Sequence, residues 1–164
     1  MTVLRPLLQH MFDEAARLNA ANILSLLERD SAARVLDLGC DDGTWTLRIA
    51  NAIGTKEVFG VDIVYERVKA ARSKGICAVI GDLNHPLPFR SDSFDCVHSN
   101  QVIEHLFNID VFIQQIHRVL RRGGYCIIST ENLASWCNVA SLVFGWQPFS
   151  CKVRYRQSTS PASW

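Results

Sequence analysis

The sequence lacks long apolar runs, an excess of either charge and the pattern of a signal peptide in its first residues. No uncharged apolar run reaches the length of about 18 residues that a classical membrane span needs. The 17 Lys and Arg residues nearly balance the 16 Asp and Glu residues, so bulk charge does not indicate a nucleic-acid surface. A signal peptide is not expected, because its apolar core would be interrupted by Arg5, Pro6, His10 and Asp13.

The sequence also lacks metal-binding spacings. Its six cysteines include no C-x-x-C pair. The histidines His10, His85 and His117 have no ligand-like spacing to acids or cysteines, so no metal site is predicted. Most of the cysteines fall within or beside apolar runs that predict buried strands. We therefore expect reduced core thiols in a cytoplasmic protein rather than disulfide bonds.

The sequence does have one stretch, residues 35–43 (VLDLGCDDG), that is typical of a cofactor cradle. Residues 35–38 predict a short buried strand, and residues 44–53 predict a helix. A strand that turns tightly into a helix binds a nucleotide cofactor when it opens a βαβ unit. Gly39 would let the backbone approach a ligand without a Cβ in the way, and Gly43 would let the helix start close to the strand.

The charges of this stretch favour one kind of cofactor. The pyrophosphate of a dinucleotide needs a helix N-terminus free of carboxylates, and Asp41 and Asp42 would repel it. The stretch also contains no G-x-G-x-x-G motif. A cofactor with an ammonium and a sulfonium, such as S-adenosylmethionine (SAM), would instead be attracted by Asp37, Asp41 and Asp42.

Two further acidic residues follow predicted strands. Asp62 closes the strand predicted at 58–61, where a carboxylate can accept hydrogen bonds from both hydroxyls of a ribose. That feature alone fits NAD equally well. Asp82 follows the apolar run 77–80 and is placed to meet the adenine end of the cofactor.

Strands and helices alternate along the rest of the chain, which predicts a parallel sheet with right-handed crossovers. Asp110 is expected to cap a helix that ends at Gly123–Gly124 and carries arginines 118, 121 and 122 in its last turn. The elements expected besides those above are helices at 4–29, 64–74 and 110–122, a helical turn at 102–106, and strands at 76–80, 94–99 and 125–129.

Four segments in order give the chain a family resemblance: VLDLGCDDG, FGVDI, GDLNHPLPFRSDSFDCVHSNQVIEHL and HRVLRRGGYCIIST. Over residues 34–130 the chain resembles class I SAM-dependent methyltransferases of the methyltransferase type 11 kind. The resemblance implies a Rossmann-like three-layer α/β/α sandwich with a mainly parallel sheet. Asp41 stands where the family's loop usually has its middle glycine, and aspartate tolerates left-handed backbone better than most residues.

The residues themselves and the resemblance both suggest roles for individual positions. Glu104 and His105 are the candidates for catalysis, since a neutral imidazole can accept a proton from a nucleophile. Alternatively, Glu104 orders the pocket, His105 only packs, and alignment of the acceptor suffices for methyl transfer. The cofactor-binding residues that the resemblance implies are Asp37, Gly39, Cys40, Asp41, Gly43, Asp62, Ile63, Asp82, Leu83 and Asn100.

The C-terminal part fits the family less well. We expect one domain over residues 1–164, with a leading helix at 1–30, a cofactor-binding core at 34–130, and an aromatic helix and flexible tail at 131–164. The fold normally adds two more strands after the fifth, and we do not expect both of them here, so the chain is a fragment, or a partner or a helix covers the sheet edge. The aromatic segment is a substrate lid, a membrane-interface anchor, a dimer contact or a plain packing helix.

The sequence thus predicts a SAM-dependent methyltransferase that acts on a small-molecule or lipid-like acceptor. No nucleic-acid partner is expected, while peripheral membrane contact and a homodimer stay open. The alternative is a truncated or degenerate methyltransferase fold that binds cofactor or a partner without turnover. A third hypothesis, an NAD-dependent oxidoreductase, is favoured only by the strand–turn–helix and Asp62. The sequence names neither the acceptor nor the attacking atom.

Overall fold

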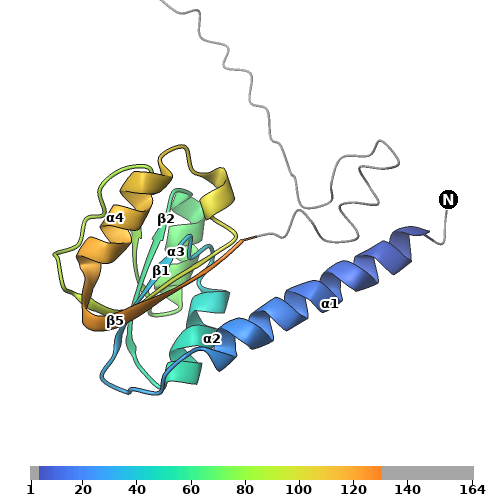
Figure 1. The fold of residues 1–164 in the computed structure, drawn as a ribbon, viewed down its shortest axis with the longest axis horizontal. Helices are drawn as coiled ribbons and strands as arrows, with labels where there is room; N and C mark the ends of the chain where they lie inside the picture. The colour runs from blue at the N-terminus through green and yellow to red at the C-terminus, as the bar shows by residue number, and fades with distance from the viewer. Residues whose placement is uncertain (1–3, 131–164) are drawn as a thin grey trace, which may run out of the picture. The chain divides into compact units, whose positions relative to one another are not determined.

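We describe residues 4–130 of the chain in a computed structural model. They belong to one compact unit, shown in Figure 1. The predictions for residues 131–164, including the missing strands and the aromatic helix, lie outside the described residues. Among the helices of the described part, none is both long and apolar enough to cross a membrane.

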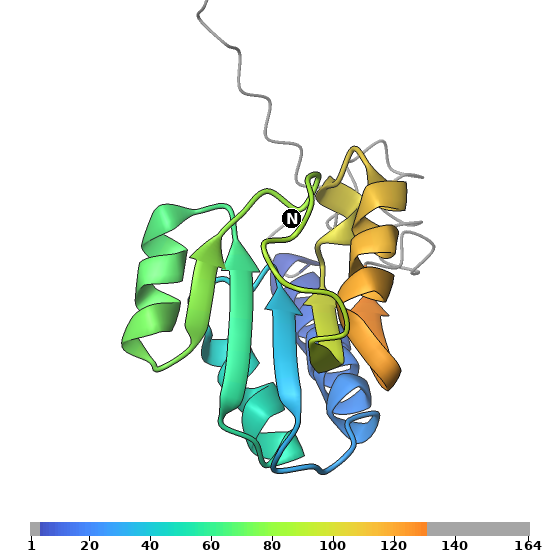
Figure 2. The same cartoon turned by 90° about the vertical axis from the view of Figure 1, so that its left-hand side faces the viewer.

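A five-stranded parallel sheet forms the centre of the described part (Figure 2). Its strand order is β3-β2-β1-β4-β5, so the chain moves outward from β1 to β3 and then returns to the other side of β1. The order reverses between β1 and β4, which is where open parallel sheets bind ligands. The strands are β1 (Arg34–Leu38), β2 (Glu57–Asp62), β3 (Cys77–Ile80), β4 (Phe94–Asn100) and β5 (Leu120–Ser129).

Helices cover both faces of this sheet, which confirms the predicted three-layer sandwich. The helices are α1 (Leu4–Ser25), α2 (Thr44–Ile53), α3 (Tyr65–Ser73) and α4 (Ile109–Val119), with a 3₁₀ turn η1 (Ile103–His105). On one face, apolar residues of α2 and α3 pack on β2 and β3, and Leu27 packs beside β1. On the other face, Phe112, Ile116 and Val119 of α4 pack on β1 and β4.

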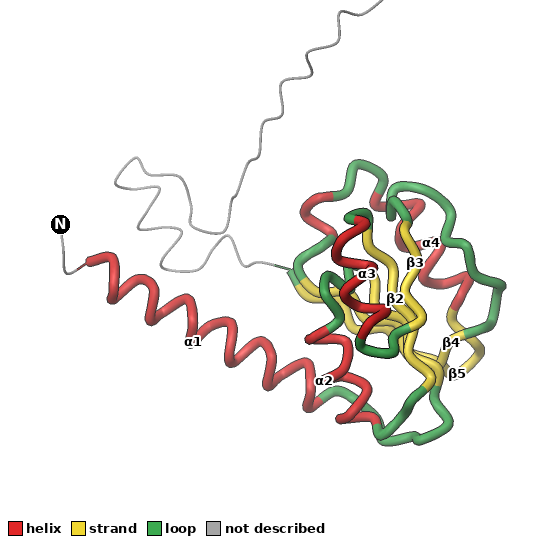
Figure 3. The backbone as a smooth tube through the Cα atoms, turned by 180° about the vertical axis from the view of Figure 1, so that it is seen from behind, coloured by secondary structure: helices red, strands yellow, loops and turns green. Residues whose placement is uncertain are grey.

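Helix α1 meets the sheet through its C-terminal half. Ile23 is buried, and the Asn19 side chain donates a hydrogen bond to Asn100 at the end of β4. Figure 3 shows the rest of the helix extending past the sheet. The helix ends at Ser25, four residues before the end predicted from the sequence.

The boundary between α4 and β5 differs from the prediction. The helix is capped by Asn108, whose side chain accepts a hydrogen bond from the Val111 amide, and not by Asp110. It ends at Val119 rather than at Gly123–Gly124, because Leu120 already pairs with Phe94 of β4.

The two glycines lie inside β5 and not at a helix end. Gly123 has a φ of 80°, and a Cβ on Gly124 would approach the Phe94 and Asp95 carbonyl oxygens at 3.0–3.1 Å. They accommodate the shift in register between β4 and β5. Arg121 therefore lies on the strand, where it forms an ion pair with Asp95, and Arg122 follows it; neither can stabilise the helix end.

Candidate cofactor-binding site

A cavity of about 390 Å³ opens where the strand order reverses, beside the carboxyl ends of β1 and β4. This volume lies within the range of small-ligand sites. Residues of β1, the following turn, the first turns of α2 and the end of β4 line it: Asp37, Gly39, Cys40, Asp41, Asp42, Thr44, Trp45, Arg48, His98 and Asn100. Five of the predicted cofactor residues are therefore brought together in one cavity.

The turn from β1 into α2 depends on left-handed backbone. Gly39 has a φ of 82°, and a Cβ there would clash with the side chain of Val102. Gly43 has a φ of 80°, and a Cβ there would clash with Ile76, so this glycine lets α2 begin close to the sheet. Asp41 has a φ of 47°, as its tolerance for this conformation led us to expect. Asp41 thus adopts the left-handed conformation that a glycine would take at this position.

The backbone amides of this turn are engaged within the protein. Gly39 and Cys40 donate to the Val61 carbonyl at 2.8 and 3.0 Å, and Gly43 donates to the Cys40 carbonyl at 2.9 Å. Asp41 donates to Asp62 Oδ2 at 2.9 Å. A pyrophosphate at a helix N-terminus needs such amides to be free. The amides of Gly39, Cys40, Asp41 and Gly43 are therefore not available to a pyrophosphate.

The acidic residues of the turn are paired with cations, which the sequence argument did not anticipate. Asp41 Oδ1 lies 3.0 Å from Arg67 Nε, and Asp42 Oδ2 lies 2.8 Å from Lys74 Nζ. The hydrogen bond from Lys74, reinforced by the Thr44 amide, holds the pKa of Asp42 well below its ordinary value. Much of the attraction that these two carboxylates would exert on a cationic ligand is therefore compensated.

Asp37 is the acidic residue that stays buried at the base of the cavity. It is 1% exposed, and Thr46 donates its hydroxyl to Oδ2. Its neighbour on β4, His98, places Nδ1 2.7 Å from Oδ1. Because Nε2 of His98 accepts from the Trp45 indole N–H at 3.3 Å, the imidazole proton lies on Nδ1 and is donated to Asp37. This chain of hydrogen bonds, the Asp37–His98 network, fixes the carboxylate in place.

Asp62 is oriented as a ribose ligand requires. Its Oδ2 accepts the Asp41 amide, and its Oδ1 accepts the Val64 amide, both at 2.9 Å. Each carboxylate oxygen keeps a lone pair for a further donor. The exposed side chain of Ile63, 64% accessible, follows immediately and offers an apolar surface beside it.

Asp82 lies at the same edge of the sheet, since the Gly81 amide before it donates to the Asp62 carbonyl at 3.0 Å. The backbone and side-chain amides of Asn84 both donate to its Oδ1 and lower the pKa of its carboxyl group. Leu83 is 8% exposed and packs in the core, so only its backbone can face a ligand. Asp62, Ile63, Asp82 and Leu83 are not among the residues that line the cavity.

Two other predicted residues line the cavity in contrasting ways. Asn100 ends β4, and its Oδ1 accepts hydrogen bonds from Asn19 of α1 and from Ser129 of β5. Cys40 is 2% exposed, and burial, followed by the negative charge of Asp37, raises the pKa of its thiol to about 12. The thiol therefore stays protonated near neutral pH and is not a nucleophile.

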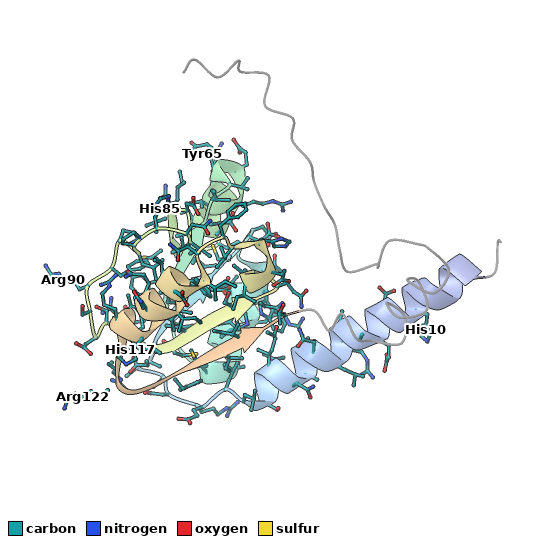
Figure 4. All side chains as sticks on the ribbon, turned by 45° about the horizontal axis from the view of Figure 1, so that its top comes forward. His10, Tyr65, His85, Arg90, His117 and Arg122 are labelled. Atoms are coloured by element: carbon teal, nitrogen blue, oxygen red, sulfur yellow. The ribbon has the colours of Figure 1, made fainter. Side chains whose placement is uncertain are left out.

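The two predicted catalytic residues lie outside the cavity lining, on η1 after β4. Both side chains are exposed, and Glu104 Oε2 accepts a hydrogen bond from Thr130 Oγ1 at 3.1 Å. Figure 4 shows His10, His85 and His117 on three separate elements. In the described part of the chain, no group of three His, Cys, Asp or Glu side chains is arranged to hold a metal ion.

Sequence reasoning missed five residues of the site, namely Thr44, Trp45, Thr46, Arg48 and His98. The alternation of side chains along a strand could have placed His98 beside Asp37 once β4 was known to pair with β1. The spacing of Trp45 and Arg48, three residues apart on a helix, puts them on one face. No residue type in this set signals a cofactor by itself.

A parallel sheet with this order, a glycine turn after its first strand and an acidic residue ending its second are the features expected of a class I SAM-dependent methyltransferase domain. A family model described as "Methyltransferase domain" matches residues 36–128. The chain belongs to this family, and the cofactor of its class I members is SAM. The glycine turn and the oriented Asp62 carboxylate fit that cofactor.

Two relatives and one solved structure agree with this family assignment. The mitochondrial ubiquinone biosynthesis O-methyltransferase of Rattus norvegicus is 32% identical over 126 residues, which cover 71% of this chain and 36% of that protein. The malonyl-[acyl-carrier protein] O-methyltransferase of Hamiltonella defensa is 28% identical, covering 84% of this chain and 53% of that protein. The structure of a SAM-dependent methyltransferase from Mesorhizobium loti has a TM-score of 0.62 and 30% identity, covering 73% of this chain and 56% of that one. The chain thus spans between about a third and somewhat over half the length of these proteins.

Proposed function

We propose that this protein transfers a methyl group from SAM to a small-molecule acceptor. The observation that carries the proposal is the cavity between β1 and β4, bordered by a glycine turn whose Asp41 amide orients the Asp62 carboxylate. The acceptor class is supported by two relatives, which are O-methyltransferases of ubiquinone biosynthesis and of malonyl-[acyl-carrier protein]. A lipid-like acceptor is the finer form of the proposal.

Different residues of the described part would bind different parts of the cofactor. Asp62 would bind the ribose hydroxyls, and Asp82 with the Leu83 backbone would bind the adenine, with Ile63 against the base. Gly39 and Gly43 would let the amino-acid part lie close to the backbone. Asp37, fixed by His98, would face its ammonium group. Cys40, Asp41 and Asn100 complete the wall of the cavity.

The chemistry proposed for the site is positioning rather than proton transfer. Bound SAM supplies a methyl group made electrophilic by its sulfonium. Among the described residues that line the cavity, His98 has the one imidazole, and both of its nitrogens are engaged in hydrogen bonds. The lining would therefore act by aligning the acceptor for in-line attack. His105, exposed on η1, stays a prediction as the proton acceptor for a hydroxyl, and Glu104 stays one beside it.

Two other expectations remain proposals. The four described cysteines are free thiols; Cys40 and Cys96 are buried as expected, whereas Cys77 and Cys126 are exposed, so the prediction of core thiols was wrong for these two. A cytoplasmic location stays a proposal. A homodimer and peripheral membrane contact remain hypotheses for the whole protein.

Calorimetric titration with S-adenosylhomocysteine tests the proposed function, with NADH as the competing ligand. We expect micromolar binding of S-adenosylhomocysteine and none of NADH. Asp62→Ala should weaken binding by about a hundredfold, since it removes a charged acceptor of two hydroxyl donors. Glu57→Ala is the matched control, because Glu57 is an exposed carboxylate at the amino end of the same strand.

The outcomes separate the hypotheses. NADH binding without a response to S-adenosylhomocysteine would favour the oxidoreductase. Binding of S-adenosylhomocysteine without methyl transfer to any acceptor offered would favour the non-catalytic module. A folded protein that binds neither ligand would contradict the proposed cofactor site.

A further inference from the structure

Arg48 is unlike the other cations near the cavity in having no acidic partner. Arg67 and Lys74 are each paired with a carboxylate of the turn, Asp41 and Asp42. Arg48 lines the cavity from the second turn of α2, and no carboxylate among the described residues forms an ion pair with it. A cation is therefore available at one wall of the cavity.

The side chain of Arg48 is held in place by an aromatic ring. Its guanidinium carbon lies 4.6 Å from the centre of the Trp45 ring, a cation–π geometry. The indole is fixed in turn, because its N–H donates to His98 Nε2 and its ring packs beside the imidazole at 6.2 Å. The Asp37–His98 network thus extends from the buried carboxylate to Arg48, and it places opposite charges at two parts of the same cavity.

This charge arrangement matches the amino-acid end of the cofactor. That end carries an ammonium and a carboxylate, and the proposed function already assigns the ammonium to Asp37. The carboxylate needs a cation with N–H donors, which among the described lining residues Arg48 alone provides. We propose that Arg48, stacked on Trp45, binds the α-carboxylate of the cofactor and selects amino-acid-bearing ligands. This inference rests on the proposed cofactor site.

The stacking makes arginine and lysine unequal at this position. A guanidinium offers a planar fork that matches a carboxylate and stacks on an indole, whereas a lysine offers only a point charge. Arg48→Lys should therefore retain part of the affinity, and Arg48→Gln should lose most of it. Both substitutions are on the surface of α2, where Arg48 is exposed, so the fold should tolerate them.

The test compares two ligands on the full chain by calorimetry. One is S-adenosylhomocysteine, and the other is its decarboxylated analogue, which keeps the amine and the adenosine. We expect the unmodified protein to prefer S-adenosylhomocysteine by about tenfold or more. Arg48→Gln should abolish this preference by weakening S-adenosylhomocysteine alone, and Arg48→Lys should fall between the two. Arg90→Gln makes the same change of charge on a peripheral loop (Figure 4) and should leave the preference intact.

Each result supports or overturns a separate statement. If the unmodified protein binds both ligands equally, or if Arg48→Gln weakens both to the same extent, the inference is wrong while the cofactor site stands. If Arg90→Gln abolishes the preference as well, the effect comes from net charge and not from Arg48. If the folded protein binds neither ligand, the proposed function itself fails.

Discussion

The two faces of the sheet are built from the same strands but differ in chemistry. On the face covered by α4, Leu36, Leu38 and Val97 form a purely apolar cluster with Phe112 and Ile116. On the face covered by α2, the intervening positions of these strands carry Asp37 and His98, which are equally buried. One face therefore contributes mainly stability, and the other uses buried polar groups to shape the cavity.

This difference follows from the pleat. Successive side chains of a strand point to opposite faces, so Leu36 and Asp37 are neighbours in sequence but belong to different layers. The polar pair remains stable because each buried donor and acceptor is matched, by Thr46 on one side and Trp45 on the other. Substitutions at adjacent positions should therefore separate stability from ligand binding.

The largest effect on stability is expected for Leu36→Ala on the apolar face. Leu36 is fully buried, so the cavity left by the substitution should lower the free energy of unfolding by about 2–5 kcal/mol. Urea unfolding measures this loss. The affinity of the folded fraction for S-adenosylhomocysteine should stay within about twofold. A tenfold loss of affinity would show that the two faces are coupled, which would break the comparison.

Asp37→Asn on the other face should have a small effect on stability and a larger effect on ligand affinity. An asparagine can still accept from His98 and donate to the Thr46 hydroxyl, so the hydrogen bonds survive while the charge is lost. We expect unfolding to become easier by only about 1–2 kcal/mol, the difference between charged and neutral hydrogen bonds. The Kd of S-adenosylhomocysteine should rise by about tenfold, or 1.4 kcal/mol.

The control for this substitution uses a ligand rather than a second variant. Methylthioadenosine has no amino-acid part, so its affinity should be unchanged by Asp37→Asn. Equal weakening of methylthioadenosine and S-adenosylhomocysteine would mean that the carboxylate acts through the shape of the turn and not through the ammonium.

The comparison of faces also shows which parts of the site can be predicted from the sequence. The glycine turn, Asp62 and the alternation of elements were found because short-range patterns specify them, namely tight turns, strand ends and helix periodicity. His98 and Trp45 were missed because their roles depend on the pairing of β4 with β1, which joins residues 61 positions apart. The ion pairs of Asp41 and Asp42 were missed for the same reason, since their partners lie on and just after α3.

The end of α4 shows that a local sequence pattern can also predict a boundary that the structure does not have. Gly123–Gly124 is an ordinary helix stop by local criteria, yet the pairing of Leu120 with Phe94 ends the helix earlier. The pairing with β4 sets the end of the helix, and local sequence patterns do not predict which strands pair. The arginines that follow were consequently assigned to the wrong element.

The smallest effect is expected for Thr46→Val, which sharpens the comparison within the α2 face. Valine has nearly the same shape but cannot donate to Asp37, so the substitution removes one hydrogen bond of the network. Stability should fall by about 1 kcal/mol, and the Kd of S-adenosylhomocysteine should rise only about two- to threefold, because His98 still holds the carboxylate. Thr55→Val is the control, since Thr55 is also buried but does not line the cavity; its hydroxyl donates to the Ala33 carbonyl and accepts from the Glu57 amide. Because it removes two hydrogen bonds, it should cost at least as much stability without changing the Kd, as measured by urea unfolding and calorimetry on both variants. If the two substitutions change the Kd equally, the threonine hydroxyl acts through general stability, and the Asp37–His98 network is not what shapes the cavity.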